Sequence, residues 1–292
     1  MRIVVASGKG GTGKTTVATS LAQVAVERYQ VRFLDCDVEA PNAALFLHPA
    51  LNTHREVGIR VPRVDAQSCT SCGKCAEVCQ FNAIAVVGKQ TLVFDDLCHG
   101  CGSCTWMCPE GAISEQLSVT GVIDAGRTAD DIAFAQGVMQ VGQTMGVPIL
   151  RELKQWGSAA VPAADDRPRR AIEIRDAPPG ASCPVVETLR GADFALLVTE
   201  PTPFGLHDLK QVAAIARELR IPAAVVVNRD GIGDDAVGAY CAERELPILL
   251  RIPMQRPIAE GIARGQTLLE AAPAYRAKFN DLLEGIVAGG HA

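Results

Sequence analysis

The chain has 292 residues and a formal net charge of −5 at pH 7, and this length is enough for one large core with a small accessory unit. A hydrophobic content of 48% is that of a globular protein and excludes a disordered chain. The acidic balance and an aromatic content of only 4% argue against nucleic-acid binding, which needs a basic surface and stacking side chains.

The first predicted strand, residues 2–6, is an apolar run typical of a parallel strand that is buried on both faces. A glycine-rich loop follows, and then a helical pattern over residues 17–28. Residues 8–15 fit the P-loop pattern G-x4-G-K-[ST] in the required strand–loop–helix order. Backbone N–H groups and the helix N-terminus favour phosphate there. We therefore expect nucleotide binding by Gly8, Lys9, Gly10, Gly11, Thr12, Gly13, Lys14, Thr15 and Thr16.

Four side chains of this region have chemistry of their own. Lys14 is expected to neutralise the β- and γ-phosphates of ATP, and Thr15 to bind Mg²⁺ through its hydroxyl. The next predicted strand, residues 31–34, leads to Asp35 and Asp37. Ligands bind at the carboxyl ends of strands in open α/β sheets, so both carboxylates are expected near the phosphates. For Asp35, a structural role at the strand end is an equal alternative.

Residues 48–64 give no clear prediction, and two cysteine runs of identical spacing, C-x2-C-x2-C-x3-C, follow them. This repetition indicates an internal duplication. Structural zinc is the weaker interpretation, because it usually shows two separated C-x2-C pairs. Disulfides are weaker still, because without a signal peptide or a membrane-length apolar run we place the chain in a reducing cytoplasm. The cysteines are Cys69, Cys72, Cys75 and Cys79, then Cys98, Cys101, Cys104 and Cys108.

The two runs resemble those of bacterial two-cluster ferredoxins, in which the fourth cysteine of each run binds the other cluster. Gln80 departs from the family pattern, which has proline there, whereas Pro109 keeps it. The resemblance implies an inserted, ferredoxin-like α+β domain at residues 63–115 with two 4Fe–4S clusters. The implied ligands are Cys69, Cys72, Cys75 and Cys108 for one cluster and Cys79, Cys98, Cys101 and Cys104 for the other.

The rest of the chain alternates predicted strands and helices, which favours a parallel sheet. Pro148 must lie near the start of one of these helices or cause a kink. Residues 158–170 resemble a surface loop. The predicted strands are residues 117–125, 132–139, 171–175, 194–199, 223–227 and 248–252, and the predicted helices are residues 141–156, 205–219, 234–245 and 273–287.

Three motifs occur in the order found in MinD-superfamily P-loop ATPases: K-G-G-T-G-K-T-T from Lys9, D-x-D from Asp35, and D-x-P-P-G from Asp176. The chain resembles this family over essentially its whole length, near the Mrp-type iron–sulfur carriers and the nitrogenase iron protein. The implied fold is α/β: a mostly parallel P-loop NTPase sheet with helices on both faces, formed by residues 1–62 and 116–292 around the insert.

The resemblance also implies roles for single residues. Lys9 would reach the nucleotide of a partner chain, although a solvated loop lysine is the alternative. Lys9 and Lys14 would stabilise charge on the transferred phosphoryl group, and Asp37 would orient the attacking water. Asp176 would bind Mg²⁺ through water, and Gly180 would sense the γ-phosphate.

Three later residues are less certain from sequence. Asn228 would read the adenine base, with the backbone near Pro253 on its other side, although an asparagine that ends a strand is also common turn chemistry. Cys183 lies where the nitrogenase iron protein has a cluster ligand. Residues 120–170 lack the second cysteine of that site, so a structural thiol is favoured.

The sequence thus predicts an ATP-hydrolysing iron–sulfur protein with ATP, Mg²⁺ and two 4Fe–4S clusters. We expect an ATP-gated electron-transfer protein, working as a homodimer or as a heterodimer with a related ATPase, beside a redox or iron–sulfur partner protein. One alternative is a cluster carrier or scaffold, but the C-x2-C pair of Mrp-type proteins is missing. The other is a positioning ATPase with a redox-sensing insert, which the acidic charge and a last helix suited to core packing disfavour.

Overall fold

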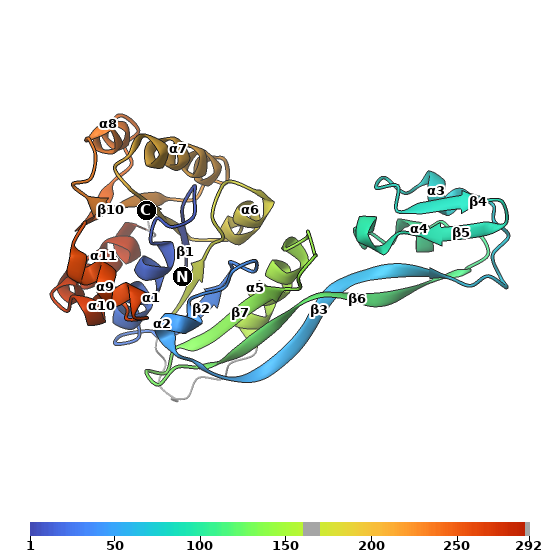
Figure 1. Ribbon diagram of the computed structural model, residues 1–292, viewed down its shortest axis with the longest axis horizontal. Coiled ribbons are helices and arrows are strands. Elements are labelled where there is room, and N and C mark those ends of the chain that lie inside the picture. Colours follow the sequence, from blue (N-terminus) through green and yellow to red (C-terminus); the bar gives the residue numbers. More distant parts are fainter. Residues whose placement is uncertain (160–169, 290–292) are drawn as a thin grey trace. The chain divides into compact units, whose positions relative to one another are not determined.

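The computed structural model describes residues 1–159 and 170–289. Its residue contacts define two compact units: Met1–Arg55, Ile123–Val138 and Leu150–Ala292 form the first, and Glu56–Val122 and Met139–Ile149 the second (Figure 1). The residues of the predicted insert, 63–115, all belong to the second unit. The boundaries 1–62, 63–115 and 116–292 stay a prediction.

A long sheet organises the first unit, and in the described part of the chain its strand order is β11-β10-β9-β1-β8-β2-β7-β6-β3. The central strand β1 (Arg2–Ala6) pairs in parallel with β8 (Ala171–Asp176) and with β9 (Phe194–Thr199). The parallel pairing continues outward on both sides through β2 (Gln30–Asp35), β7 (Ala133–Met139), β10 (Ala223–Asp230) and β11 (Ile248–Pro253). The predicted α/β fold with a mostly parallel sheet is confirmed.

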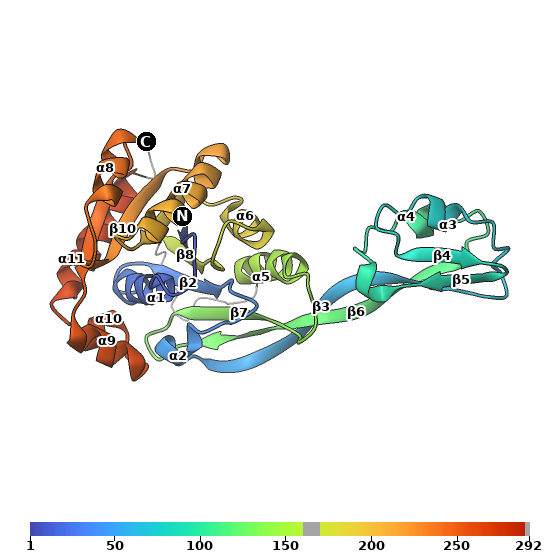
Figure 2. The ribbon, with the colours of Figure 1, turned by 45° about the horizontal axis from the view of Figure 1, so that its top comes forward.

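Helices cover both faces of this sheet, which explains why its strands are continuous apolar runs. Ile3 and Val5 pack into one core, and Val4 and Ala6 into another. The first core includes residues of α1 (Lys14–Ala25) and α11 (Tyr275–Gly289), and the second includes residues of α6 (Cys183–Leu189), α7 (Pro203–Glu218) and α8 (Ala236–Glu243). In Figures 1 and 2, α1 lies beside α11, and α7 lies beside α8.

Some elements of the first unit differ from the prediction. The helix expected from residue 141 is α5 (Val147–Ala159), so Pro148 lies in its first turn, where a missing N–H costs no hydrogen bond. The loop expected at residues 158–170 lies largely outside the described residues. Further short helices were not predicted, and they are α2 (Ala44–Leu47), α6, α9 (Arg256–Ala263) and α10 (Leu268–Ala271).

Two long strands have residues in both units: β3 (Ala50–Val64), where the sequence gave no clear prediction, and β6 (Ile113–Arg127). Each strand has a glycine at a position where the backbone of the other strand leaves no room for a side chain. A Cβ on Gly126 would lie 1.8 Å from the carbonyl oxygen of Ala50, and a Cβ on Gly58 would lie 1.9 Å from that of Ser118. Residue 50 of β3 thus faces residue 126 of β6, and residue 58 faces residue 118. Because the numbers rise along one strand and fall along the other, the two strands are antiparallel.

The second unit carries the cysteine runs on small elements. Its hairpin pairs β4 (Ile84–Val87) with β5 (Gln90–Val93). The short helices α3 (Lys74–Glu77) and α4 (Ser103–Trp106) lie on one side of this hairpin (Figure 2). A 3₁₀ turn at Asp95–Leu97 precedes the second cysteine run. In the described residues of either unit, no helix is long and apolar enough to cross a membrane.

We expect Gly126→Ala to destabilise the protein, because the added methyl group must displace the Ala50 backbone. Overpacking of this kind costs about 1–3 kcal/mol, which thermal unfolding will report as a lower midpoint. Gly285→Ala in α11 is the matched control, since its Cβ would meet no atom closer than 3.9 Å and alanine is the better helix former. Equal midpoints for the two variants would contradict the close pairing of β3 and β6.

Candidate functional site

The P-loop lies between β1 and α1, and two of its glycines are required by close contacts. A Cβ on Gly8 would lie 2.3 Å from the carbonyl oxygen of Asp208, and a Cβ on Gly13, whose φ is +92°, would lie 2.3 Å from Nδ2 of Asn228. Asn228 Nδ2 also donates a hydrogen bond of 2.8 Å to the carbonyl oxygen of Thr12. The end of β10 is therefore fixed directly onto the phosphate loop.

An open hollow of about 420 Å³ lies beside this loop. It contains most of the residues that the sequence predicts for nucleotide binding. Those on its lining are Gly10, Gly11, Gly13, Lys14, Thr15, Thr16, Asp37, Asn228 and Pro253. The other predicted residues, Gly8, Lys9, Thr12, Asp176 and Gly180, are not part of that lining.

Apolar side chains at the same hollow were not predicted. Phe46 comes from α2, Met254 follows β11, and Ile258 and Ile262 come from α9. The signal for α9 was present but weak: Pro257 at the start of the helix, followed by apolar residues at helical spacing. They add apolar surface to a hollow whose P-loop residues supply backbone N–H groups.

Asp35 has a structural task in this structure. It is fully buried, and it accepts backbone hydrogen bonds from Asp37 (3.1 Å), Asn42 (2.9 Å) and Ala43 (2.9 Å). Burial raises its pKa to about 6, although these three donors oppose the rise. Asp35 thereby holds the loop that presents Asp37 to the hollow. Burial also raises the pKa of Asp37, and the Lys14 ammonium opposes that shift.

Asp176 is a buried carboxyl group at the end of β8. Only 1% of the residue is exposed, and in the described residues neither carboxylate oxygen has a hydrogen-bond partner. Burial and then the nearby Asp35 raise the pKa of Asp176 to about 8. A buried carboxylate without partners needs a compensating ligand, and a hydrated divalent cation beside Thr15 would fit this need.

Lys9 lies near the start of the P-loop, and its ammonium donates a hydrogen bond to Glu200. The second oxygen of Glu200 accepts a bond of 3.1 Å from Arg229. The Ser7 hydroxyl donates to the carbonyl oxygen of Lys9 (2.6 Å), and the Gly180 N–H donates to the carbonyl oxygen of Ser7 (3.0 Å). Sequence reasoning missed Glu200, because a single glutamate after a strand has no pattern to identify it.

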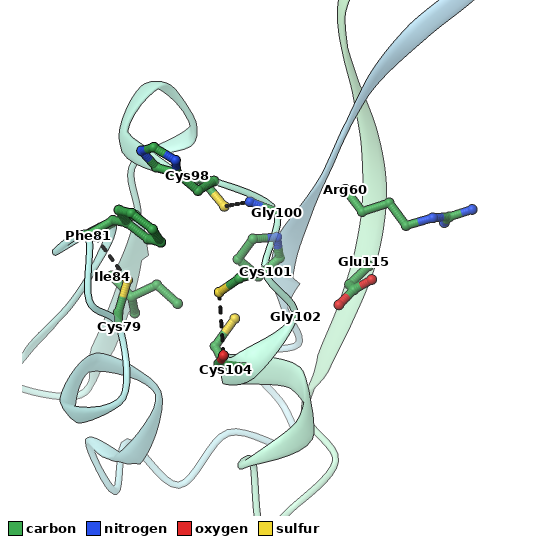
Figure 3. A pocket seen from close by; sticks show the side chains of 14 residues that line it. Arg60, Cys79, Phe81, Ile84, Cys98, Gly100, Cys101, Gly102, Cys104 and Glu115 are labelled. Carbon is green, nitrogen blue, oxygen red and sulfur yellow. Dashed lines mark hydrogen bonds between the residues drawn. The ribbon is translucent and has the colours of Figure 1, made fainter. Parts of the chain in front are cut away.

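The second unit contains two hollows, each lined by four cysteines. One takes three cysteines from the second run and one from the first, and Figure 3 shows their sulfur atoms facing a shared space. The other takes three from the first run and one from the second. The two sets are Cys79, Cys98, Cys101 and Cys104, and Cys69, Cys72, Cys75 and Cys108.

Several sulfur atoms already accept hydrogen bonds. The Ala83 N–H lies 3.3 Å from Cys79 Sγ, and the Gly100 N–H lies 3.4 Å from Cys98 Sγ. The Thr91 hydroxyl lies 3.5 Å from Cys69 Sγ, and this contact helps to hold the pKa of Cys69 below its usual value. Donors of this kind stabilise negative charge on sulfur.

The first hollow has an aromatic wall. The rings of Phe81 and His99 stack with centroids 3.7 Å apart and line the hollow beside Cys79 and Cys98. The other cysteines are placed differently: Cys183 is exposed at the start of α6, while Cys36 and Cys241 are buried. In the part of the chain that the structure describes, no group of three or more His, Cys, Asp or Glu side chains is arranged to hold a single metal ion.

A parallel sheet with a glycine-rich loop after its central strand, and an open hollow at that loop, defines a P-loop nucleotide-binding protein. The sequence profile of the CobQ/CobB/MinD/ParA nucleotide binding domain family matches residues 3–268, and the chain belongs to this family. With the lysine-bearing P-loop, this makes the protein a P-loop ATPase.

Two relatives come from Methanocaldococcus jannaschii. The uncharacterized protein MJ0579 is 31% identical over 283 residues, which cover 97% of this chain and 93% of the relative. The uncharacterized protein MJ0578 is 31% identical over 234 residues, 80% of each chain. Among solved structures, the septum site-determining protein MinD of Pyrococcus horikoshii, in complex with Mg-ADP, superposes with a TM-score of 0.58 at 20% identity, over 100% of this chain and 98% of that one. At this identity the likeness establishes the fold.

The buried Asp176 predicts a pH dependence for the nucleotide-free protein. Between the ordinary pKa of 3.8 and the raised value of about 8, the folded state keeps a proton that the unfolded state has lost, so the free energy of unfolding falls as pH rises. Asp176→Asn removes this contribution. We expect the variant's thermal midpoint to exceed that of the original protein by a margin that grows from about pH 5 to about pH 8.

The measurement is thermal unfolding without nucleotide or Mg²⁺ across that pH range. Asp35→Asn serves as the comparison, because Asp35 is equally buried but accepts three backbone N–H groups. An amide NH2 in place of Oδ2 cannot accept the N–H groups of Asn42 and Ala43, so this replacement should lower the midpoint across the whole range. A constant margin for Asp176→Asn at all pH values would show that its carboxylate is not held protonated by burial.

Proposed function

We propose that this ATPase is an ATP-gated electron-transfer protein, in which nucleotide binding in the first unit controls two 4Fe–4S clusters in the second. The observation that carries the proposal is the pair of cysteine-lined hollows, each with three thiols from one run and the fourth from the other. This is the ligand exchange expected of a two-cluster ferredoxin.

The donor chemistry supports a cluster better than a single ion. Four thiols around one zinc must all come within about 2.3 Å of it, whereas in a cubic cluster each thiolate binds a different iron and the sulfurs surround a volume. Here the four sulfurs of one set surround a shared hollow. When bound, such clusters transfer single electrons at low potential. The N–H groups of Ala83 and Gly100 would tune that potential through their bonds to sulfur.

The first unit would bind and hydrolyse MgATP. Lys14 and the P-loop N–H groups would hold the phosphates, and Thr15 and Asp176 would hold Mg²⁺, Asp176 through water. Asp37 lies on the hollow's lining, where it can orient the attacking water. Lys9 would act on the transferred phosphoryl group after a rearrangement, since its ammonium is bound to Glu200 in this structure.

The adenine base would lie beside the apolar residues of the hollow, between Asn228 and the backbone near Pro253. The aliphatic side chains of Ile258 and Ile262 would contact the ring there. Because the Asn228 amide donates to Thr12 and its oxygen accepts from the Arg229 N–H at 2.9 Å, reading the base requires at least one of these bonds to be exchanged. The same residue would then link base recognition to the phosphate loop.

We further propose that the protein acts as a dimer, either with itself or with a related ATPase, beside a redox partner protein. Two relatives in one organism, each 31% identical to this chain, make a pairing of related chains reasonable. A second candidate function is a positioning ATPase with a redox-sensing insert. It is favoured by the fold match to MinD of Pyrococcus horikoshii and to the MinC:MinD cell division complex of Aquifex aeolicus.

An anaerobic redox titration of the iron-reconstituted protein, followed by EPR with and without MgATP, tests the proposal. A shift of about 60 mV in a one-electron couple, or about 1.4 kcal/mol of coupling between nucleotide and cluster, supports ATP gating. Unchanged potentials together with cluster delivery to an apo-ferredoxin would favour the carrier alternative. Unchanged potentials without delivery would leave the positioning ATPase.

Two variants separate the sites. Lys14→Ala is expected to lose nucleotide binding by about 10-fold or more, since it removes a charge-assisted phosphate contact, while its iron content stays equal to that of the original protein. Cys72→Ser is expected to disturb one cluster signal and to keep most of the ATPase activity. Loss of iron in Lys14→Ala, or loss of nucleotide binding in Cys72→Ser, would contradict two separate sites.

A further inference from the structure

Glu200 is a nearly buried carboxylate that the nucleotide chemistry described above does not use. It directly follows β9 (Phe194–Thr199), and its side chain is only 8% exposed. Burial by itself would raise its pKa, but the Lys9 ammonium and the Arg229 guanidinium hold that pKa below its usual range. Glu200 therefore stays charged in the folded protein, and its two oxygens hold two different cations.

These two cations come from different elements. Lys9 belongs to the start of the P-loop, and Arg229 follows Asn228 at the end of β10. Arg229 has a left-handed backbone with φ of +54°, which is a strained conformation for a residue with a side chain. The ion pair with Glu200 is one contact that offsets this strain.

The ion pair with Glu200 holds the Lys9 ammonium away from the hollow in which we expect the nucleotide. Lys9 is not among the described residues that line the hollow, and its side chain is 32% exposed while its ammonium is bound to Glu200. An ammonium has three N–H donors, but while this one is paired with Glu200 the Lys9 side chain stays off the lining of the hollow. Any use of Lys9 in hydrolysis must therefore first break a charge-assisted hydrogen bond in a poorly solvated place.

We propose that Glu200 is a positioning residue that restrains Lys9, so that hydrolysis reaches its full rate only after Lys9 has exchanged this carboxylate for the phosphates of ATP. The inference rests on the catalytic role proposed for Lys9 and adds the residue that controls it. Glu200 itself touches no reacting atom. Its effect is on the population of chains in which Lys9 is free to act.

The test measures kcat and KM for ATP in Glu200→Gln and Glu200→Ala. Gln keeps the shape of the side chain but loses the charge, and Ala removes every acceptor atom. We expect kcat to rise about fivefold or more, at least as much in the Ala variant as in the Gln variant. KM is expected to stay unchanged, because Lys14 and the P-loop backbone still bind the phosphates.

A matched control is Glu187→Gln. Glu187 is another buried glutamate, 9% exposed at its side chain, which pairs with Lys154 at 2.6 Å. Neither residue lines the nucleotide hollow, so the control should leave kcat unchanged. Thermal unfolding of all variants verifies that each one is folded.

A double variant tests whether Glu200 changes kcat through Lys9. If Glu200 acts through Lys9, Lys9→Ala/Glu200→Ala should have the same kcat as Lys9→Ala alone. An unchanged or lower kcat in both folded Glu200 variants overturns the proposal, and so does a rise that persists without Lys9. If Lys9→Ala alone keeps the original kcat, the catalytic role of Lys9 itself has failed, which is a separate result from failure of the restraint.

Discussion

Two buried carboxyl groups that lie side by side constrain the whole nucleotide site. Asp35 and Asp176 are register partners on the neighbouring strands β2 and β8, and both are almost completely buried. Like charges opposite each other across a pair of strands are destabilising. The fold satisfies one of them with three backbone donors and leaves the other without a partner. The buried Asp176 carboxyl is therefore the group that we propose binds Mg²⁺ through water when nucleotide is present.

The remaining contacts of the site follow from this arrangement. The donors that satisfy Asp35 are the backbone of the Asp37 loop, so one buried carboxylate places another on the lining of the hollow. On the other side of β1, Glu200 occupies the end of β9 and binds the first lysine of the P-loop. The acidic groups at the ends of β2, β8 and β9 thus differ in their contacts: Asp35 holds a loop, Asp176 has no hydrogen-bond partner among the described residues, and Glu200 binds Lys9.

The sequence predicted those parts of the protein whose chemistry has a fixed spacing. The P-loop, the aspartates that follow two strands, and the two sets of four cysteines that the structure brings around separate hollows were all accessible from pattern. The central strands were accessible because burial on both faces makes them continuous apolar runs. β3 was not, since it is mostly exposed along its first half and its residues show no regular alternation. Glu200 and the apolar residues of α9 reach the site only through tertiary packing, which no local pattern encodes.

The bond from the Gly180 N–H to the Ser7 carbonyl oxygen has an energetic consequence for such an ATPase. If that N–H is to meet a γ-phosphate, it must leave an acceptor that it already has, so the protein gains only the difference between a neutral and a charge-assisted hydrogen bond. Charge-assisted bonds are about twice as strong as neutral ones. ATP and its hydrolysis product would then differ by only a modest free energy at this position, because the Ser7 carbonyl oxygen remains available as the acceptor once the γ-phosphate is gone.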